Sequence, residues 1–383
     1  MTVPHAPEFL WYLPNFVEAG HRGDTESAED GHGTLEHQVG LAEAVEEAGW
    51  TGALLGTSWG RPDTFTVATA LAARTRTFEP LIAIRPGYWR PANFATSAAT
   101  LDQLSRGRVR VNIVSGQDDL AAYGDREESR AARYARTKEF MRLVRRLWTE
   151  EDVTFAGDHF QVIGSTVAPR PYATEARPHP RLYFGGASAE AEAVAATEAD
   201  VQLFWGEPLD GIAERVERLR GLEQELERDL PPLEFGLRIT TLIRDTREEA
   251  WHDAEERVRQ MAESAGDREL RRSGRAAVGQ SRLLDLAERG DVLDDCLYTA
   301  PGRYGGGGAG TTWLVGSADD VAAALSRYQE LGVSHFVLSD TPYRTEVARV
   351  GQALIPRLRD GDPAVPTAPN GVRLPQATGK TRF

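Results

Sequence analysis

Short apolar runs that are rich in branched and aromatic residues alternate along the chain with amphipathic stretches of helical period. This alternation is typical of βα units, in which each buried parallel strand is followed by a helix. Periodicity alone does not distinguish a closed barrel from an open sheet, but the number of strand-like runs favours an α/β fold of the (β/α)8 TIM-barrel type. The runs are 9–14, 51–56, 80–86, 109–114, 182–185, 201–205, 235–243 and 335–338.

Two segments interrupt this rhythm. Residues 152–163 alternate apolar and polar positions around a Gly-Asp pair, which predicts a β-hairpin inserted before the fifth strand. Residues 265–312 are charged and then glycine-rich, and a loop of this length in a compact domain is usually functional or disordered, so we expect a mobile lid over the mouth of the barrel. We therefore expect one barrel domain over 1–360 and a proline-rich tail over 361–383.

The charge balance narrows the set of partners. The 383 residues include 58 acidic and 44 basic side chains, and the net charge of −14 opposes binding to nucleic acids and to anionic membranes. A single cysteine, Cys296, excludes an intramolecular disulfide and fits a reducing compartment. Residues 1–13 lack the basic start and long apolar core of a secretion signal, and no apolar run reaches the roughly 18 residues of a membrane span, so we expect neither. The sequence thus predicts a cytoplasmic enzyme-sized protein.

Two hydrolase classes are not supported by the motifs. His21, His32 and His37 do not have the spacing of a HExxH site and have no matching acidic cluster, so we expect no metal. No G-x-S-x-G turn follows any predicted strand, which speaks against a serine hydrolase.

Glycine and polar positions gather where the predicted strands end. Gly185, Gly186 and Ser188 lie between the fifth strand and its helix, where the backbone can approach a phosphate closely and unpaired N–H groups face it; a structural turn is the alternative. Asn112 and Ser115 end the fourth strand, and their side chains suit the polar edge of a ring cofactor or an ordinary Asx turn.

Aromatic residues accompany these positions. Tyr134 and its neighbour Arg133 lie on a helical stretch from which they would reach a phosphate at the rim, although most such residues are solvated surface. Trp205 ends the sixth strand, where it either packs in the core or forms a wall of the pocket.

Short segments in a fixed order carry a resemblance to a known family. They are 11–14, 49–52, 84–86, 99–108, 112–116, 133–134, 183–188, 205–208, 235–238, 308–311 and 336–339. Together they resemble the bacterial-luciferase-like flavin monooxygenases, and most closely the FMNH2-dependent alkanesulfonate monooxygenases. The resemblance extends over nearly the whole chain.

This resemblance implies a barrel with insertions that assembles into a homodimer or homotetramer. It implies FMN as the cofactor, delivered as FMNH2 by a separate NAD(P)H-dependent flavin reductase and used with O2. Transferred by position, Gly185, Gly186 and Ser188 with Tyr134 hold the FMN phosphate. Asn112 and Ser115 would contact the flavin ring, and Trp205 would lie beside it. The implied substrate is a small organic molecule, such as an alkanesulfonate that would be cleaved to an aldehyde and sulfite.

The chemical lining departs from the family pattern. Arg238 matches an active-site arginine, whose fixed fork of donors suits an oxyanion, with a structural salt bridge as the alternative. Arg61, Thr240 and Thr341 replace an active-site cysteine, histidine and tyrosine, and Phe16 replaces a further histidine. Arg303 matches the lid arginine when a three-residue shift is allowed.

We interpret these departures as an altered substrate. Arg61, Arg85 and Arg238 would form a pocket for a sulfonate, sulfinate or carboxylate, with Thr240 and Thr341 nearby, and Arg61, Arg238 and Arg303 are the catalytic candidates. Two other hypotheses stay open at this point. One is a deazaflavin (F420)-dependent oxidoreductase that transfers hydride, and the other is a non-catalytic flavin-binding protein.

Overall fold

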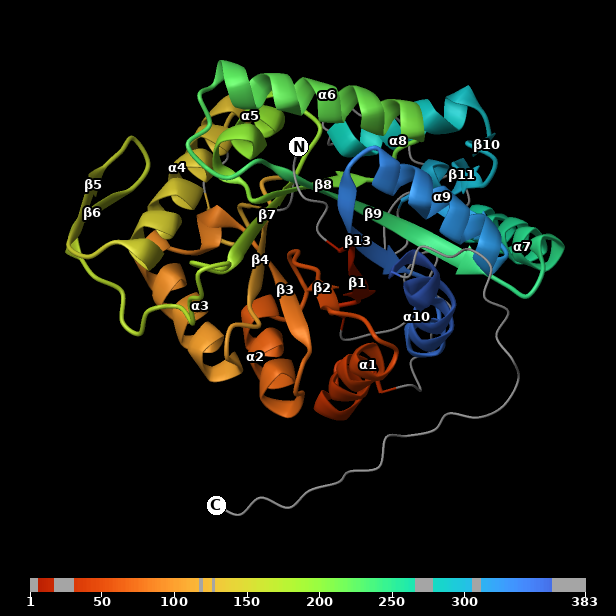
Figure 1. Ribbon diagram of the computed structural model, residues 1–383, viewed down its shortest axis with the longest axis horizontal. Coiled ribbons are helices and arrows are strands. Elements are labelled where there is room, and N and C mark those ends of the chain that lie inside the picture. Colours follow the sequence, from red (N-terminus) through yellow and green to blue (C-terminus); the bar gives the residue numbers. More distant parts are fainter. Residues whose placement is uncertain are drawn as a thin grey trace, which may run out of the picture.

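The computed structural model describes residues 6–16, 31–116, 120–125, 128–265, 278–304 and 311–359. Within these residues, eight parallel strands form a closed barrel in the order β1-β2-β3-β4-β7-β8-β9-β13, and β13 pairs again with β1 (Figure 1). The strands are β1 (Glu8–Leu13), β2 (Gly52–Leu55), β3 (Glu79–Ile84), β4 (Arg110–Ile113), β7 (Arg181–Gly185), β8 (Val201–Trp205), β9 (Glu234–Ile243) and β13 (Val333–Ser339). The predicted α/β TIM barrel is confirmed, and each of the eight strand-like runs forms one of its strands.

Helices surround the barrel, and polar side chains fix where several of them begin. The Asp63 carboxylate accepts a hydrogen bond from the Thr66 amide at 2.8 Å, and Ser317 and Asp320 form a reciprocal capping box. The helices are α1 (Leu35–Glu47), α2 (Thr64–Arg74), α3 (Pro91–Ser105), α4 (Arg130–Thr149), α5 (Ala189–Glu198), α6 (Leu209–Glu225), α7 (Arg247–Ala265), α8 (Val278–Arg289), α9 (Ala318–Glu330) and α10 (Tyr343–Arg359). Among the residues described, none of these helices is long and apolar enough to cross a membrane.

The barrel strands are buried on both faces because helices cover the outside and side chains fill the inside. Phe9 to Leu13 in β1 are all buried, and Phe9 stacks on Phe336 of β13 with 5.6 Å between ring centres. Parallel strands in this setting read as nearly continuous apolar runs, which is why the sequence pattern located them.

A charged cluster closes the N-terminal end of the barrel. Arg110 donates to Glu79 at 2.6 Å and to the Tyr183 hydroxyl at 2.6 Å, and it is also paired with Glu8. His335 lies 2.7 Å from Glu234 and continues the cluster across the barrel. These side chains surround Arg110, so the charged groups are paired with one another. Little of Arg110 is exposed.

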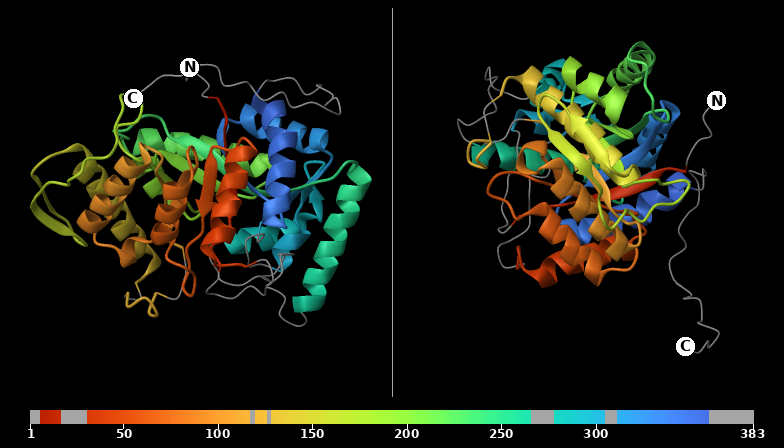
Figure 2. Two further views of the ribbon diagram at one scale, coloured as in Figure 1. Left: turned by 90° about the horizontal axis from the view of Figure 1, so that it is seen from below. Right: turned by 90° about the vertical axis from the view of Figure 1, so that its left-hand side faces the viewer.

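The segment before the fifth barrel strand forms an antiparallel pair, β5 (Val153–Ala156) and β6 (Gln161–Ser165). This hairpin projects at the opposite end of the molecule from α7 (Figure 2). It stands as a separate two-stranded sheet and adds no strand to the barrel.

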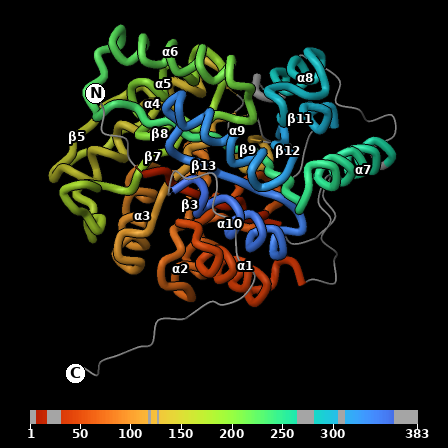
Figure 3. Tube along the Cα trace, turned by 45° about the vertical axis from the view of Figure 1, so that its right-hand side comes forward, coloured from red at the N-terminus to blue at the C-terminus, as the bar shows by residue number. Residues whose placement is uncertain are grey.

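The part of the expected lid that the structure describes is folded, which differs from the loop suggested by its sequence. After α8 come β10 (Val292–Leu293), β11 (Leu297–Tyr298) and a short 3-10 helix, Ala300–Arg303 (Figure 3). β11 pairs with β12 (Trp313–Gly316), an unpredicted strand that extends the sheet beside the end of β9. Helix α8 forms because Leu283, Leu284 and Ala287 recur at helical spacing and are buried. Residues 266–277, 305–310 and 360–383, which include the glycine run and the tail, lie outside the described residues.

Candidate active site at the mouth of the barrel

The loop between β7 and α5 brings the backbone close to Tyr134. Gly186 has a φ of +150°, a conformation that side chains other than hydrogen rarely allow. A Cβ atom on Gly186 would lie 2.5 Å from the Ala191 Cβ and 3.7 Å from the Tyr134 hydroxyl. Only glycine fits here, and the gap that it leaves is bordered by a phenolic donor from α4.

Ser188 caps the helix that follows this loop. Its hydroxyl oxygen accepts a hydrogen bond from the Ala191 amide at 3.2 Å, so it begins α5. The backbone N–H of Glu190 and the Ser188 hydroxyl hold the pKa of the Glu190 carboxyl below its usual value. Ser188 therefore already serves the local structure, and any contact with a phosphate would add to that role.

Asn112 points into the barrel near its mouth. Alternate residues of a strand share a face, so Asn112 lies on the same face as Arg110, whose guanidinium bonds Tyr183. The side-chain oxygen of Asn112 is buried and has no hydrogen-bond partner among the described residues. A buried acceptor without a donor is costly, which marks this position as suited to a ligand that carries an N–H group.

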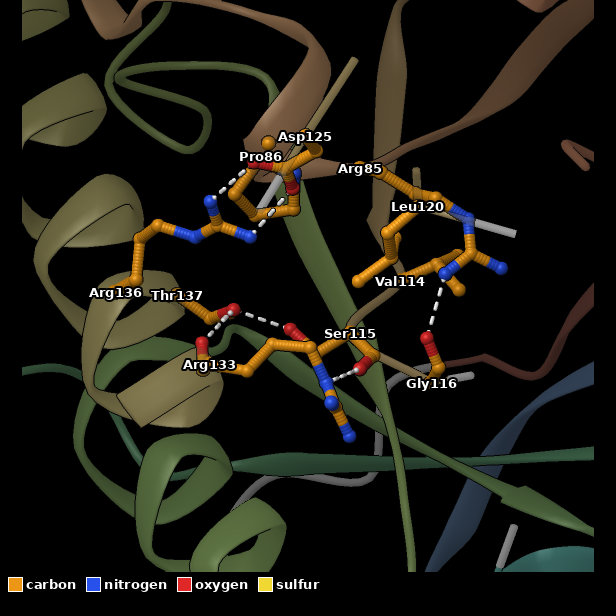
Figure 4. Close-up of a pocket in the computed structure, with 11 residues that line it drawn as sticks. Arg85, Pro86, Val114, Ser115, Gly116, Leu120, Asp125, Arg133, Arg136 and Thr137 are labelled. Carbon is orange, nitrogen blue, oxygen red and sulfur yellow. Dashed lines mark hydrogen bonds and ion pairs between the residues drawn. The ribbon is translucent and has the colours of Figure 1, made fainter. Parts of the chain in front are cut away.

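A small pocket lies between the ends of β3 and β4 and the start of α4 (Figure 4). Arg85 donates to the Gly116 carbonyl at 2.7 Å, and Arg133 donates to the Ser115 carbonyl at 2.7 Å. The Ser115 hydroxyl lies against the Thr137 hydroxyl, so it faces α4. These two arginines thus hold the loop after β4 through its backbone carbonyls.

Arg238 and Arg61 each lie against an aromatic ring that belongs to β1 or to the residues just after it. The guanidinium of Arg238 lies over the Tyr12 ring at 4.4 Å, and that of Arg61 lies over the Phe16 ring at 4.2 Å. Burial lowers the pKa of Arg238, the hydroxyls of Tyr12 and Tyr343 oppose this, and the charge of Arg61 lowers it further. Because the charge of Arg61 acts on Arg238, an anion placed near both would be stabilised by each of them.

The other expected site residues lie in several places. Thr240 of β9 shares a hydrogen bond of 3.2 Å with Ser339 at the end of β13, and the Thr341 amide donates to the Asp340 carboxylate at 2.8 Å. Trp205 is 36% exposed and pairs in register with Arg238. Arg303 does not join Arg61 and Arg238 in the described contacts, since its guanidinium bonds Asp291 and the Ala287 carbonyl.

The sequence reasoning missed Tyr12 and Tyr343, whose rings lie 6.1 Å apart beside Arg238. Tyr343 follows Thr341 by two residues, so a tyrosine is present near the strand end where the family pattern has one. The signal for Tyr12 was its place at the end of the first predicted strand. Neither residue could be assigned to the site without knowing which way its side chain points.

A buried carboxyl pair behind β13 was also missed. Asp340 is paired with Arg257 at 2.6 Å, and Arg244 lies 3.5 Å from Glu346. Burial and the nearby Asp340 carboxyl raise the pKa of Glu346 to about 7. Burial also raises the pKa of Asp340, although Arg257 and Arg244 oppose it.

Comparisons with known proteins agree with this architecture. The family model described as luciferase-like monooxygenase matches residues 8–335. Among solved structures, a riboflavin lyase shares 20% identity with a TM-score of 0.74, covering 94% of this chain and 93% of that one. EDTA monooxygenase from Chelativorans sp. BNC1 shares 16% identity with a TM-score of 0.72, covering 92% and 94%. An F420-dependent secondary alcohol dehydrogenase shares 16% identity with a TM-score of 0.66, covering 93% and 100%.

Proposed function

The chain belongs to the luciferase-like monooxygenase family, and from this premise we propose that it is a two-component flavin-dependent monooxygenase. In this proposal it takes FMNH2 from a separate NAD(P)H-dependent flavin reductase and oxidises a small anionic organic substrate with O2. Alkanesulfonates and related organosulfur compounds are the leading substrates, with release of an aldehyde and sulfite. We also expect the protein to act as a homodimer or homotetramer.

The observation that carries the proposal is the buried Asn112 side-chain oxygen, which has no partner among the described residues. A reduced flavin ring presents N–H groups along its polar edge, and one of these would satisfy this acceptor. The residues present therefore fit the cofactor. When bound, the reduced flavin would supply the two electrons that activate O2.

The remaining cofactor contacts follow from the loop after β7. Tyr134 would donate its hydroxyl hydrogen to the phosphate in the gap that Gly186 leaves. The Ser188 hydroxyl and the N–H groups at the start of α5 would add donors on the same side. Trp205 would border the ring and limit the access of water.

Arg61 and Arg238 support the substrate part of the proposal. Their two guanidiniums would bind the acidic group of the substrate, and the aromatic rings beneath them would hold the forks in place. Because Thr240 and Thr341 bear no group that titrates near neutral pH, any proton transfer would fall to other groups, and Tyr12 and Tyr343 lie beside Arg238. To take part, Arg303 would have to leave Asp291 and Arg85 would have to leave the Gly116 carbonyl.

The direct test supplies the protein with FMN, NADH, a flavin reductase and a panel of alkanesulfonates, sulfinates and carboxylates, and it measures oxygen uptake together with sulfite and oxygenated products. We expect one class of anion to give product in proportion to oxygen consumed. If FMNH2 binds but no compound in a broad panel yields product, the protein is better described as a non-catalytic flavin-binding protein.

A second candidate is an F420-dependent oxidoreductase, since an F420-dependent alcohol dehydrogenase has the same fold. That cofactor would transfer hydride without consuming O2. Parallel titrations with FMN and F420, followed by anaerobic assays with an alcohol panel, separate the two candidates. Tight binding of F420 with oxygen-independent turnover would replace our proposal.

A further inference from the structure

The carbonyl of Gly186 is hydrogen-bonded by two side chains from neighbouring elements of the barrel. It accepts hydrogen bonds from Arg215 of α6 and from the Gln202 amide of β8, the latter at 3.1 Å. Because a trans peptide is planar, with its C=O and N–H pointing in opposite directions, these bonds turn the Ala187 N–H away from Arg215. The orientation of this peptide therefore depends on where the Arg215 guanidinium lies.

Arg215 is fixed on every side. Its side chain is only 2% exposed, its guanidinium lies over the Phe204 ring at 4.7 Å, and it donates to Glu192 and Glu207 at 2.9 Å each. A guanidinium is a planar fork whose donors cannot move independently. A shift of either carboxylate would therefore move the donor that bonds the Gly186 carbonyl.

Glu207 extends this chain of contacts to α8. Its carboxylate accepts a hydrogen bond from the Arg282 Nε at 2.8 Å and a second one from Arg282 Nη2. The side chain of Glu207 is 3% exposed, so its charge is balanced by Arg215 on one side and by Arg282 on the other. Loss of either arginine leaves a buried carboxylate with one partner, which draws that partner toward it.

We propose that Arg215 is a positioning residue for the Gly185–Gly186 loop, and that its ion pairs through Glu207 to Arg282 couple the site of the flavin phosphate to helix α8. This inference rests on the proposed function for the identity of the ligand. The coupling itself is a property of the protein without flavin. Movement of α8 would be transmitted to the loop through one guanidinium fork and one carboxylate, with no intervening backbone segment.

The chain offers a matched control on the same helix. Arg289 of α8 pairs with Asp210 at the start of α6 at 2.7 Å, as Arg282 pairs with Glu207, but Asp210 does not lead to Arg215 in the described contacts. Replacing Arg289 removes one link between α8 and α6 and leaves the path to Gly186 intact. Both Arg282→Met and Arg289→Met therefore remove an ion pair of α8, but only Arg282→Met breaks the path to Gly186.

The test measures amide hydrogen exchange in the full-length, flavin-free protein. In Arg282→Met we expect exchange in the peptide that spans Gly185 and Gly186 to be about fivefold faster, while α2 exchanges as in the parent. In Arg289→Met the loop should exchange as in the parent. Unchanged loop exchange in Arg282→Met would overturn the coupling, and so would an equal increase in α2, since that indicates general destabilisation.

Flavin titration of the same proteins separates this inference from the proposed function. If the parent binds FMNH2, Arg282→Met should bind it roughly tenfold more weakly and Arg289→Met should bind it normally. Equal affinity in the parent and Arg282→Met overturns the link to the phosphate. A parent that binds no flavin contradicts the proposed function, while the exchange experiment still decides whether α8 and the loop are coupled.

Discussion

The guanidinium of Arg238 lies 4.4 Å from the centre of the Tyr12 ring, and Arg238 pairs in register with Trp205, the last residue of β8. This contact holds a cation in a largely buried position, where burial lowers its pKa and the nearby Arg61 lowers it further. Arginine nevertheless keeps its charge at every physiological pH. A buried positive charge of this kind gains most from a negatively charged partner, which makes Arg238 the first residue to test.

Replacing Arg238 or Arg61 by Met should raise the KM for an anionic substrate by roughly 10- to 100-fold, because each change removes a charged hydrogen bond. The affinity for FMNH2 should change far less. Steady-state kinetics and flavin titration measure the two effects separately. Arg357→Met, which breaks an ion pair with Asp319 on the outer helices, is the control. Normal kinetics in both site variants would remove the anion pocket.

Tyr134→Phe should weaken FMNH2 binding about tenfold and leave the fold intact, because it deletes one donor to the phosphate. Anaerobic fluorescence titration gives the dissociation constants. An unchanged affinity would mean that the phosphate lies elsewhere.

Ser188→Ala should have two effects, and a control variant at the cap of another helix distinguishes them. Loss of the helix cap should lower the free energy of unfolding by about 1 kcal/mol, and loss of the hydroxyl should weaken FMNH2 binding. Ser317→Ala removes the cap of α9 and should reproduce only the first effect. Equal flavin affinity in both variants would restrict Ser188 to its capping role.

Glu8 should make the protein sensitive to acid. Burial would raise the pKa of Glu8, but the hydrogen bond with His335 and the charge of Arg110 hold it well below 4.5. A depressed pKa contributes stability above the unfolded value, and this stability is lost as the pH falls below about 4.5. Glu8→Gln should therefore destabilise the protein by about 3 kcal/mol at neutral pH, and the difference should shrink in acid.

Denaturant titrations of the parent and Glu8→Gln across the acid range measure this difference. Glu150→Gln, which breaks an exposed ion pair with Arg146, is the control and should change stability by less than about 1 kcal/mol. A constant difference between the parent and Glu8→Gln at all pH values would show that Glu8 is not the group that titrates.

Glu346 should make the protein less stable as the pH rises, which is the opposite of the effect of Glu8. Its pKa is raised to about 7, so the folded state holds a proton that the unfolded state releases near 4.5. The parent should therefore lose stability as the pH rises from about 4.5 to 7, and Glu346→Gln should lose less. Unfolding curves across that window test this. Parallel pH profiles for the two proteins would contradict it.

The barrel strands could be predicted from the sequence because burial on both faces gives continuous apolar runs, as in β1. Helix α8 was missed because charged residues surround it and its apolar positions are few. Asn112 and Gly186 could be placed because Asn112 lies within a predicted strand and Gly186 directly follows one. Arg215 could not, since its partners Glu192 and Gly186 lie 23 and 29 residues away and only the closed barrel brings them together.

The charged cluster around Arg110 determines from which end molecules can enter the barrel. It fills the N-terminal end of the barrel with paired side chains, so in the described part of the chain this end offers no passage to the interior. Cofactor, oxygen and substrate would then all use one entrance at the opposite end of the barrel. A flavin whose ring reaches Asn112 and a substrate held by Arg61 and Arg238 would both pass through this entrance. A single entrance of this kind would favour ordered binding, in which whichever of flavin and substrate lies deeper binds first and leaves last.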